Sequence, residues 1–237
     1  MSSNGGYATL NWLYENALKI EDVVWKTKTP FASVRRIVQN EKYFFKIKPG
    51  LWALNDFKDS LPENVAALIQ KDESETKTEK EHIFSHYYYQ GLLAEIGNLK
   101  KCSTYVPPQD KNKPYLNKKL GEVTSIERLP LFAYQETIDK IKSIDVIWLN
   151  QRGYPNSVFE VEHSTTFKNS LIKFNELQDF STKMFVVAPK VKENEYKSAI
   201  DFSVFENIKG RIKFMDYTMI EGLYEHTLRT RKFDFFN

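Results

Sequence analysis

Three carboxylates in the second half of the chain have the spacing of a metal site. Glu160 and Glu162 flank Val161 in a segment with strand character, so their side chains point to the same face. Asp145 precedes Glu160 by 15 residues and comes beside both glutamates if the two segments pair across the intervening turn. Hard cations such as Mg²⁺ take oxygen ligands and keep several waters. A site of this kind can activate a water and stabilise charge on a phosphate.

The competing interpretation is that these acidic residues only form the solvated face of an antiparallel sheet. The sequence around them argues against it, because both segments are otherwise apolar. The flanking residues are Ile144, Val146, Ile147, Trp148, Val158, Phe159 and Val161. Burying carboxylates among such side chains is costly unless a cation neutralises them. The context therefore favours a metal site over a solvated face.

Other polar residues near the acidic triplet have two interpretations each. Glu95 lies in an amphipathic segment and either completes the acidic cluster or is a surface glutamate. Lys168 and Lys173, in the next helical segment, either bring positive charge to the acids or are exposed lysines. His163 points to the strand face opposite the glutamates, which favours a core or helix-capping role over catalysis. Spacing alone leaves these alternatives open.

The elements that must position these residues follow from the periodicity of the apolar residues. It predicts helices over 84–99 and 167–178 and strands over 141–149 and 157–162. The apolar run Met184–Ala188, which ends at Pro189, is typical of a buried central strand. Strands that alternate with helices indicate an α/β fold, here a mixed sheet flanked by helices.

The first quarter of the chain predicts a separate small domain. Helical spacing extends over residues 7–17, and a second helix begins at Pro30 and continues through Val38. Residues 43–47 and 51–54 predict the two strands of a hairpin. Helices followed by a small hairpin favour a winged helix-turn-helix.

The composition divides the chain further. Residues 59–81 are rich in Glu, Asp, Lys, Ser and Thr and cannot build a core of their own. We therefore predict a winged helix-turn-helix domain over 1–57, a linker over 58–80, and a second domain with the mixed sheet over 81–237.

Basic residues concentrate in two regions. Between Lys26 and Lys48, seven basic residues stand against Glu41 alone, and a second basic stretch follows at 100–119. Such faces suit phosphates. In a winged helix, Ser33, Arg35, Arg36 and Gln39 would enter the major groove as base readers. The predicted DNA-binding residues are these four with Lys28, Lys46, Lys48, Lys111, Lys113, Lys118, Lys168 and Lys173. A solvated basic face or a protein-binding winged helix is the alternative.

Bulk properties exclude several classes of protein. The formal charge of the 237 residues is only +3, so the chain is not a polybasic tail. Cys102 is the single cysteine, which rules out an internal disulfide framework and a cysteine-ligated zinc site. No signal peptide or membrane-spanning run is evident. We expect a cytoplasmic bacterial protein.

The segment from Glu95 through Ile144-Asp145-Val146 to Phe-Glu-Val-Glu-His-Ser-Thr at 159–165 resembles the PD-(D/E)xK nuclease superfamily over roughly residues 84–220. The resemblance implies that Asp145 and Glu160 bind the metal, and that Glu95 is a further ligand, as the first-helix acid is in several members. The superfamily has lysine where Glu162 stands. Some restriction enzymes also carry glutamate there, and Glu162 would then act as a carboxylate base. The implied catalytic residues are Asp145, Glu160, Glu162 and Glu95.

The front domain resembles the HARE-type winged helix, a family found fused to bacterial restriction endonucleases. The resemblance covers most of residues 7–57 and rests on the segment from Trp25 to Arg36, on Phe44–Ile47, and above all on the Gly-Leu-Trp-Ala-Leu string at 50–54. It implies a DNA-binding role for this part of the chain.

Together these resemblances predict a sequence-specific type II restriction endonuclease that hydrolyses phosphodiester bonds in double-stranded DNA with Mg²⁺, or with Mn²⁺ in its place. The expected partners are DNA, a second copy of the chain on DNA, and a cognate DNA methyltransferase. Two alternatives remain. One is an inactive nuclease-fold DNA-binding regulator, with Glu162 marking the loss of activity, and the other is a modification-dependent or repair nuclease.

Overall fold

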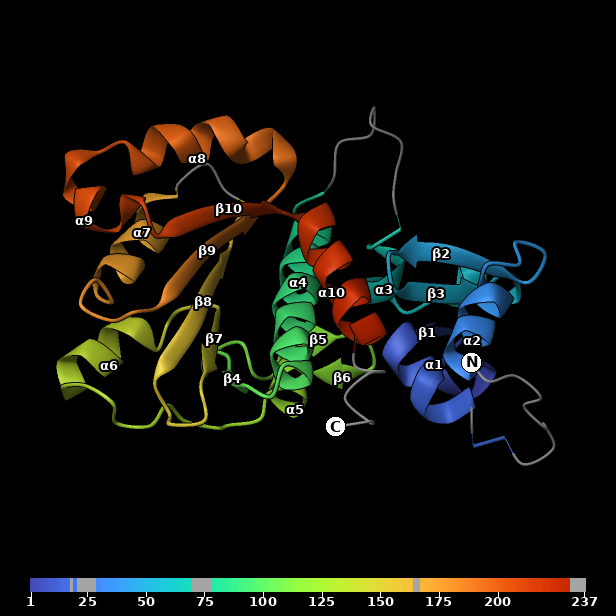
Figure 1. The fold of residues 1–237 in the computed structure, drawn as a ribbon. Helices are drawn as coiled ribbons and strands as arrows, with labels where there is room; N and C mark the ends of the chain where they lie inside the picture. The colour runs from blue at the N-terminus through green and yellow to red at the C-terminus, as the bar shows by residue number, and fades with distance from the viewer. Residues whose placement is uncertain (18, 21–28, 70–77, 164–166, 231–237) are drawn as a thin grey trace. The chain divides into compact units, whose positions relative to one another are not determined.

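The structure is a computed structural model that describes residues 1–17, 19–20, 29–69, 78–163 and 167–230. The chain forms two compact units, a small unit of Met1–Glu81 with Tyr224–Asn237 and a large unit of His82–Leu223 (Figure 1). Both combine helices with a sheet, so the predicted α/β class with a mixed sheet is confirmed. No described helix is long and apolar enough to cross a membrane.

The small unit is built on an antiparallel sheet in the order β1-β3-β2. Its elements are the 3-10 turn Ser2–Asn4, β1 (Tyr7–Thr9), α1 (Leu10–Ala17), α2 (Pro30–Val38), β2 (Phe44–Lys48), β3 (Leu51–Leu54), the 3-10 helix Asn55–Ser60 and α3 (Glu63–Ala66). The predicted second helix and hairpin are confirmed. The helix predicted from residue 7 is wrong for its first three residues, because the buried Tyr7 and Thr9 pair with β3 as a strand.

The compact units differ from the predicted domains in two places. Within the predicted linker, Val65 and Leu68 are buried, so this described part packs in the small unit instead of standing apart. Residues 70–77 of the linker lie outside the described residues. At the other end, Tyr224 packs against Gly50 so closely that an added Cβ on the glycine would lie 2.9 Å from its ring. The described residues from Tyr224 to Thr230, which the sequence places in the second domain, therefore group with the small unit.

The large unit contains a mixed sheet in the order β10-β9-β8-β7-β4. The strands are β4 (Ser103–Tyr105), β7 (Val146–Leu149), β8 (Pro155–Val161), β9 (Lys183–Ala188) and β10 (Ile212–Asp216). Neighbouring strands from β4 to β8 are antiparallel, whereas β8, β9 and β10 are parallel. Parallel neighbours need crossover connections, and α7 (Lys168–Asn175), then α8 (Glu193–Ile200) and α9 (Glu206–Lys209) supply them. The apolar run at 184–188 is an interior strand, as predicted.

Helices cover both faces of this sheet. Ile147 and Leu149 of β7 point into the core formed with α6 (Gln135–Ile141), α7 and α8. Trp148 between them points to the other face, where its indole N–H donates to the carbonyl of Leu93 at 3.0 Å. Leu93 belongs to α4 (Glu79–Leu99), so α4 packs on the face opposite α7. The sheet therefore separates the side chains of α4 from those of α7, and the two sets can approach each other only where strands begin or end.

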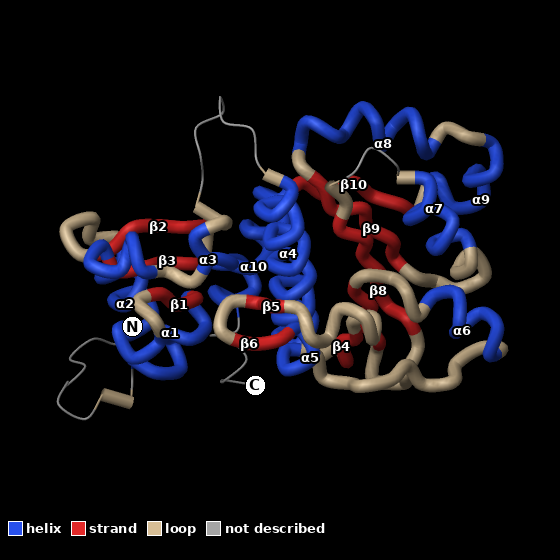
Figure 2. The backbone as a smooth tube through the Cα atoms, turned by 180° about the vertical axis from the view of Figure 1, so that it is seen from behind, coloured by secondary structure: helices blue, strands red, loops and turns tan. Residues whose placement is uncertain are grey.

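Two predictions for the surrounding elements need correction. The strand predicted from residue 141 begins at Val146, because Ile138 and Ile141 are buried at helical spacing in α6. The basic stretch at 100–119, over which no helix or strand is predicted, contains β4 and a hairpin of β5 (Pro114–Tyr115) and β6 (Lys118–Lys119), followed by α5 (Leu120–Val123). Figure 2 shows this hairpin beside α4, where the ring of Tyr115 lies against Gly91.

The last strand and helix complete the large unit. The helix α10 (Tyr217–Thr230) follows β10 directly, and its residues up to Leu223 belong to this unit. The ring of Tyr217 stacks on Tyr89 of α4 with 3.8 Å between centroids. The hydroxyl of Tyr89 donates to Glu221 at 2.7 Å, so the start of α10 is fixed to α4 by stacking and by a buried hydrogen bond.

Candidate active site

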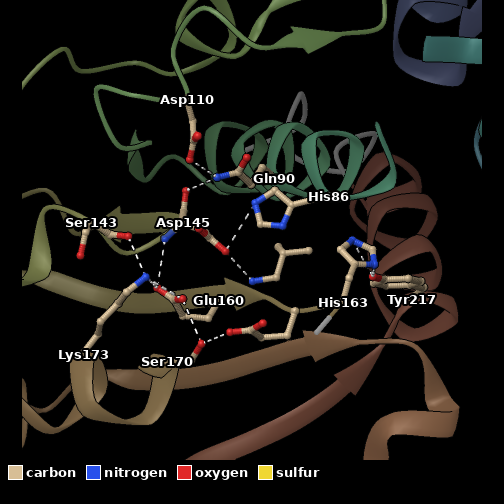
Figure 3. Close-up of polar contacts among 12 residues, drawn as sticks. His86, Gln90, Asp110, Ser143, Asp145, Glu160, His163, Ser170, Lys173 and Tyr217 are labelled. Atoms are coloured by element: carbon tan, nitrogen blue, oxygen red, sulfur yellow. Dashed lines mark hydrogen bonds and ion pairs between the residues drawn. The ribbon is translucent and has the colours of Figure 1, made fainter. Parts of the chain in front are cut away.

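Asp145 and Glu160 meet where β7 pairs with β8. Val146 lies opposite Phe159, so the predicted antiparallel pairing across the turn is confirmed. The Asp145 amide donates to Glu160 Oε1 at 3.3 Å, and the Val161 amide donates to Asp145 Oδ2 at 2.8 Å (Figure 3). We call Asp145, Glu160 and Glu162 the carboxylate cluster.

Two side chains of α7 reach the carboxylate cluster from one helix face. Ser170 and Lys173 are three residues apart and therefore neighbours on the helix surface. Lys173 Nζ lies 2.9 Å from both Glu160 oxygens, and Ser170 Oγ lies 3.1 Å from Glu160 Oε2. Ser170 Oγ also contacts Glu162 Oε1. A hydroxyl has one proton to donate, so these two carboxylates cannot both be satisfied by Ser170 while both are ionised.

Burial makes the charge of this cluster costly. The exposed fractions are 9% for Asp145 and 3% for Glu160. Desolvation, opposed by the Val161 hydrogen bond and by Lys173, raises the pKa of Asp145 to about 7. Desolvation and the charge of Asp145, opposed by Lys173, raise the pKa of Glu160 to about 8. One lysine does not neutralise three carboxylates, so the site favours either bound protons or a cation.

A second group of potential ligands adjoins Asp145 on the side of α4. One ligand atom from each of His86, Asp110 and Asp145 lies within 4.8 Å of the others, and we call these residues the imidazole–carboxylate group. Gln90, one turn after His86, donates from Nε2 to Asp110 Oδ2 at 3.0 Å and to the Asp145 carbonyl at 3.2 Å (Figure 3). Of the predicted metal ligands, this group contains only Asp145.

Glu95 lies on a different side of α4 from this group. Nine residues separate it from His86, which at 100° per residue is half a turn of rotation. It shares a face with Tyr88, seven residues earlier. Burial, followed by the charges of Glu221 and Glu95, raises the pKa of the Tyr88 hydroxyl well above its usual value. The described residues thus do not bring Glu95 into the imidazole–carboxylate group.

Lys168 and His163 both make contacts outside the carboxylate cluster. Lys168 Nζ lies 4.1 Å from the centroid of the Phe202 ring, away from the contacts of Lys173. His163 lies on the strand face opposite the glutamates, as predicted, and contacts the Tyr217 hydroxyl at 2.9 Å. The rings of His82 and His86 lie 5.6 and 5.8 Å from that of His163, which adds imidazoles to this side of the sheet.

The sequence did not single out His86, Gln90, Asp110 or Ser170. His86 and Gln90 are one turn apart on a helix, a spacing that is visible in the sequence, but many polar pairs have it. Asp110 comes from a turn closed by its amide to the Pro107 carbonyl at 3.0 Å, and only the tertiary fold carries it to Asp145. Ser170 is recognisable only once α7 is packed on β8.

The predicted DNA-binding residues of the small unit have different surroundings. A pocket of about 180 Å³ is lined by Leu10, Arg35, Val38, Gln39, Lys46, Trp52, Glu225 and Arg229. Arg36 is exposed on α2, and Ser33 is half-buried there. Lys48 is buried, so it is less accessible to a phosphate than expected. Lys28 lies outside the described residues.

In the large unit, the predicted lysines also differ in their surroundings. Lys111 Nζ donates to the Glu127 carbonyl, and Lys113 Nζ lies 5.6 Å from the centroid of the Tyr87 ring. Lys118 is exposed on β6. Lys118 is therefore the most accessible of the three.

The raised pKa values of Asp145 and Glu160 predict how stability depends on pH when no divalent cation is bound. The folded protein keeps protons on these carboxyls up to about pH 7 and 8, whereas the unfolded chain loses them near its ordinary values of 3.8 and 4.5. Because the folded state binds more protons in this window, its free energy of unfolding should fall as the pH rises to about 8. Urea unfolding in chelator at pH 6 and pH 8.5 measures the fall.

The double variant D145N/E160Q is the control for this dependence, since neither replacement titrates. It should lose most of the difference in unfolding free energy between the two pH values. An unchanged difference in the variant would assign the dependence to other groups.

Comparison of the sequence with known proteins identifies a protein family for this chain. Residues 62–236 match the family described as the type II restriction enzyme NmeDI C-terminal domain. The type II restriction enzyme NmeDI of Neisseria meningitidis serogroup C is 24% identical over 157 residues, which cover 62% of this chain and 44% of that protein. The chain thus spans less than half the length of this relative. No solved structure matches the chain. Because the match extends over most of its length, the chain belongs to the family of the NmeDI C-terminal domain of type II restriction enzymes.

Proposed function

We propose that this chain is a sequence-specific type II restriction endonuclease of the PD-(D/E)xK superfamily that hydrolyses double-stranded DNA with Mg²⁺. The observation that carries the proposal is the meeting of Asp145 and Glu160 across β7 and β8, with Lys173 bound to Glu160. The membership of a type II restriction enzyme family supports it.

The order of elements also supports the superfamily assignment. The resemblance predicts a helix, a strand with the aspartate, a strand with the glutamates, a helix and an apolar strand. The large unit has α4, β7, β8, α7 and β9 in this order, with Asp145 directly before β7 and Glu160 in β8. The elements predicted to carry the motif are therefore present in the order that the resemblance requires.

The residues present fit a divalent cation. Asp145 and Glu160 are buried carboxylates, and Ser170 cannot donate to both Glu160 and Glu162 at once. We assign Asp145 and Glu160 as the residues that would hold Mg²⁺, for which Mn²⁺ could substitute. The chemistry that the cation supplies when bound is a lower pKa for the attacking water and stabilisation of charge on the scissile phosphate.

Lys173 takes the role that the superfamily gives to the lysine of the motif. Glu162 stands at that motif position, whereas Lys173 approaches from α7 and places its ammonium on Glu160. In the proposed reaction Lys173 stabilises negative charge that develops beside Glu160. Glu162, oriented by Ser170, accepts the proton of the attacking water. The absence of lysine at position 162 is then compensated from a neighbouring element.

The small unit is assigned the recognition of DNA as a winged helix of the HARE type. In its favour are the helix α2, the hairpin of β2 and β3, and β1 on the other side of β3. Arg35, Gln39 and Lys46 share one pocket, so a phosphate or base edge can contact them together. Assembly as a homodimer on DNA and protection of the host site by a cognate methyltransferase belong to the same proposal.

The test incubates purified protein with plasmid and phage DNA in Mg²⁺ and maps the ends. Discrete fragments with fixed ends are expected from a sequence-specific endonuclease. Tight binding without cutting, in Mg²⁺ and in Mn²⁺, would favour the inactive DNA-binding regulator. Cutting only of methylated or damaged DNA would favour the modification-dependent or repair nuclease.

A further inference from the structure

The imidazole–carboxylate group differs in chemistry from the carboxylate cluster that it adjoins. His86 Nε2 lies 3.8 Å from Asp145 Oδ2, which is too far for a hydrogen bond. Together with Asp110, these residues offer one nitrogen and two oxygens within 4.8 Å of one another. Because His86 and Asp145 face each other without a hydrogen bond, the three ligand atoms leave space for an ion between them.

The three residues come from separate elements that Gln90 holds together. His86 is on α4, Asp110 follows β4, and Asp145 precedes β7. Gln90 is fully buried, and its amide nitrogen donates to both the Asp110 carboxylate and the Asp145 carbonyl. Its Oε1 is also buried and accepts no hydrogen bond from the described residues.

The charges in this group are only partly balanced, because Lys173 lowers the pKa of Asp145 but forms its ion pair with Glu160. Lys173 pairs with Glu160 on the far side of Asp145, and in the described part of the chain no lysine or arginine forms an ion pair with Asp110 or Asp145. Two partly buried carboxylates beside a histidine therefore carry a negative charge that a cation would neutralise.

We propose that His86, Asp110 and Asp145 bind a divalent transition-metal ion, in a subsite separate from the Glu160 side of Asp145. Imidazole nitrogen suits ions such as Co²⁺ and Zn²⁺, whereas Mg²⁺ prefers oxygen ligands and keeps its waters. Mn²⁺ takes both kinds of ligand and is a suitable probe. The role of this ion in catalysis rests on the proposed function, in which Asp145 would contact two ions. Metal binding itself can be measured without cleavage.

The experiment titrates the full-length protein with Mn²⁺ and follows its electron paramagnetic resonance, with Mg²⁺ as competitor. Pulsed spectra should contain a ¹⁴N coupling from a coordinated imidazole. In H86A this coupling should vanish and Mn²⁺ affinity should fall by at least about tenfold, while Mg²⁺ affinity changes much less. D110N should weaken Mn²⁺ binding and keep the nitrogen coupling. In D110N the new side chain can still accept the hydrogen bond from Gln90, so its fold is preserved.

H82N is the matched control, because His82 lies on α4 one turn before His86 and outside the ligand group. It should bind Mn²⁺ like the parent protein and keep the nitrogen coupling. Absence of a nitrogen coupling in the parent protein, or equal Mn²⁺ affinity in H86A, would overturn the subsite. Neither result would contradict the proposed function, which is tested separately by the cleavage of plasmid and phage DNA.

Discussion

Replacement of Asp145 by asparagine should abolish DNA cleavage and leave DNA binding intact. The carboxylate is held at the end of β8 by the Val161 amide and belongs to both groups of potential ligands. Asparagine has nearly the same shape and can still accept this hydrogen bond, but it removes the negative charge that would attract a cation. We expect the cleavage rate to fall on the order of 10⁴-fold or more, as when one member of a catalytic unit is lost. Single-turnover cleavage and gel-shift binding measure the two properties.

The matched control is D139N. Asp139 is an exposed residue of α6 that pairs with Lys142 at 2.7 Å, remote from the cluster in its contacts. This variant should cleave like the parent protein. If D145N kept more than a tenth of the parental rate, Asp145 would not be a metal ligand in the reaction and the assigned site would be wrong.

The parts of the site that the sequence predicts are those fixed by local pattern. Alternation in β8 places Glu160 and Glu162 on one face, and a short turn is sufficient to bring Asp145 alongside. Both facts depend on residues 145–162 alone. The apolar flanks identify these strands as buried, which is why the carboxylates could be interpreted as a costly and therefore functional feature.

The parts that the sequence misses depend on tertiary packing. The resemblance predicts Glu95 as a ligand because it is an acid on the first helix, but the rotation of α4 presents His86 and Gln90 to Asp145 instead. Helical spacing predicts a helix over the strand Tyr7–Thr9, because the partner of this strand lies over forty residues away in β3 and leaves no local signal. Spacing alone does not decide whether Lys168 and Lys173 reach the acids, whereas the packing of α7 places Lys173 on Glu160 and Lys168 over the Phe202 ring. No local sequence pattern predicts these tertiary contacts.

Replacement of Lys173 by methionine should destabilise the protein as well as inactivate it. Glu160 is 3% exposed, and Lys173 supplies its ion pair. At pH 9, above the Glu160 pKa of about 8, removal of one partner leaves a buried charge without compensation, which costs about 3 kcal/mol in free energy of unfolding. Urea unfolding in chelator measures this loss. As a control, K140M removes the more exposed pair of Lys140 with Glu176 and should cost less than about 1 kcal/mol.

The double variant E160Q/K173M separates the structural role of the lysine from its role in the reaction. With both charges removed no buried charge is left unpaired, so most of the stability lost in K173M should return. Cleavage should not return, because the proposed reaction needs the ammonium and the carboxylate themselves. Recovery of cleavage together with stability would show that Lys173 only maintains the fold. Recovery of stability alone would show that the reaction needs the Lys173–Glu160 pair for more than the stability of the fold.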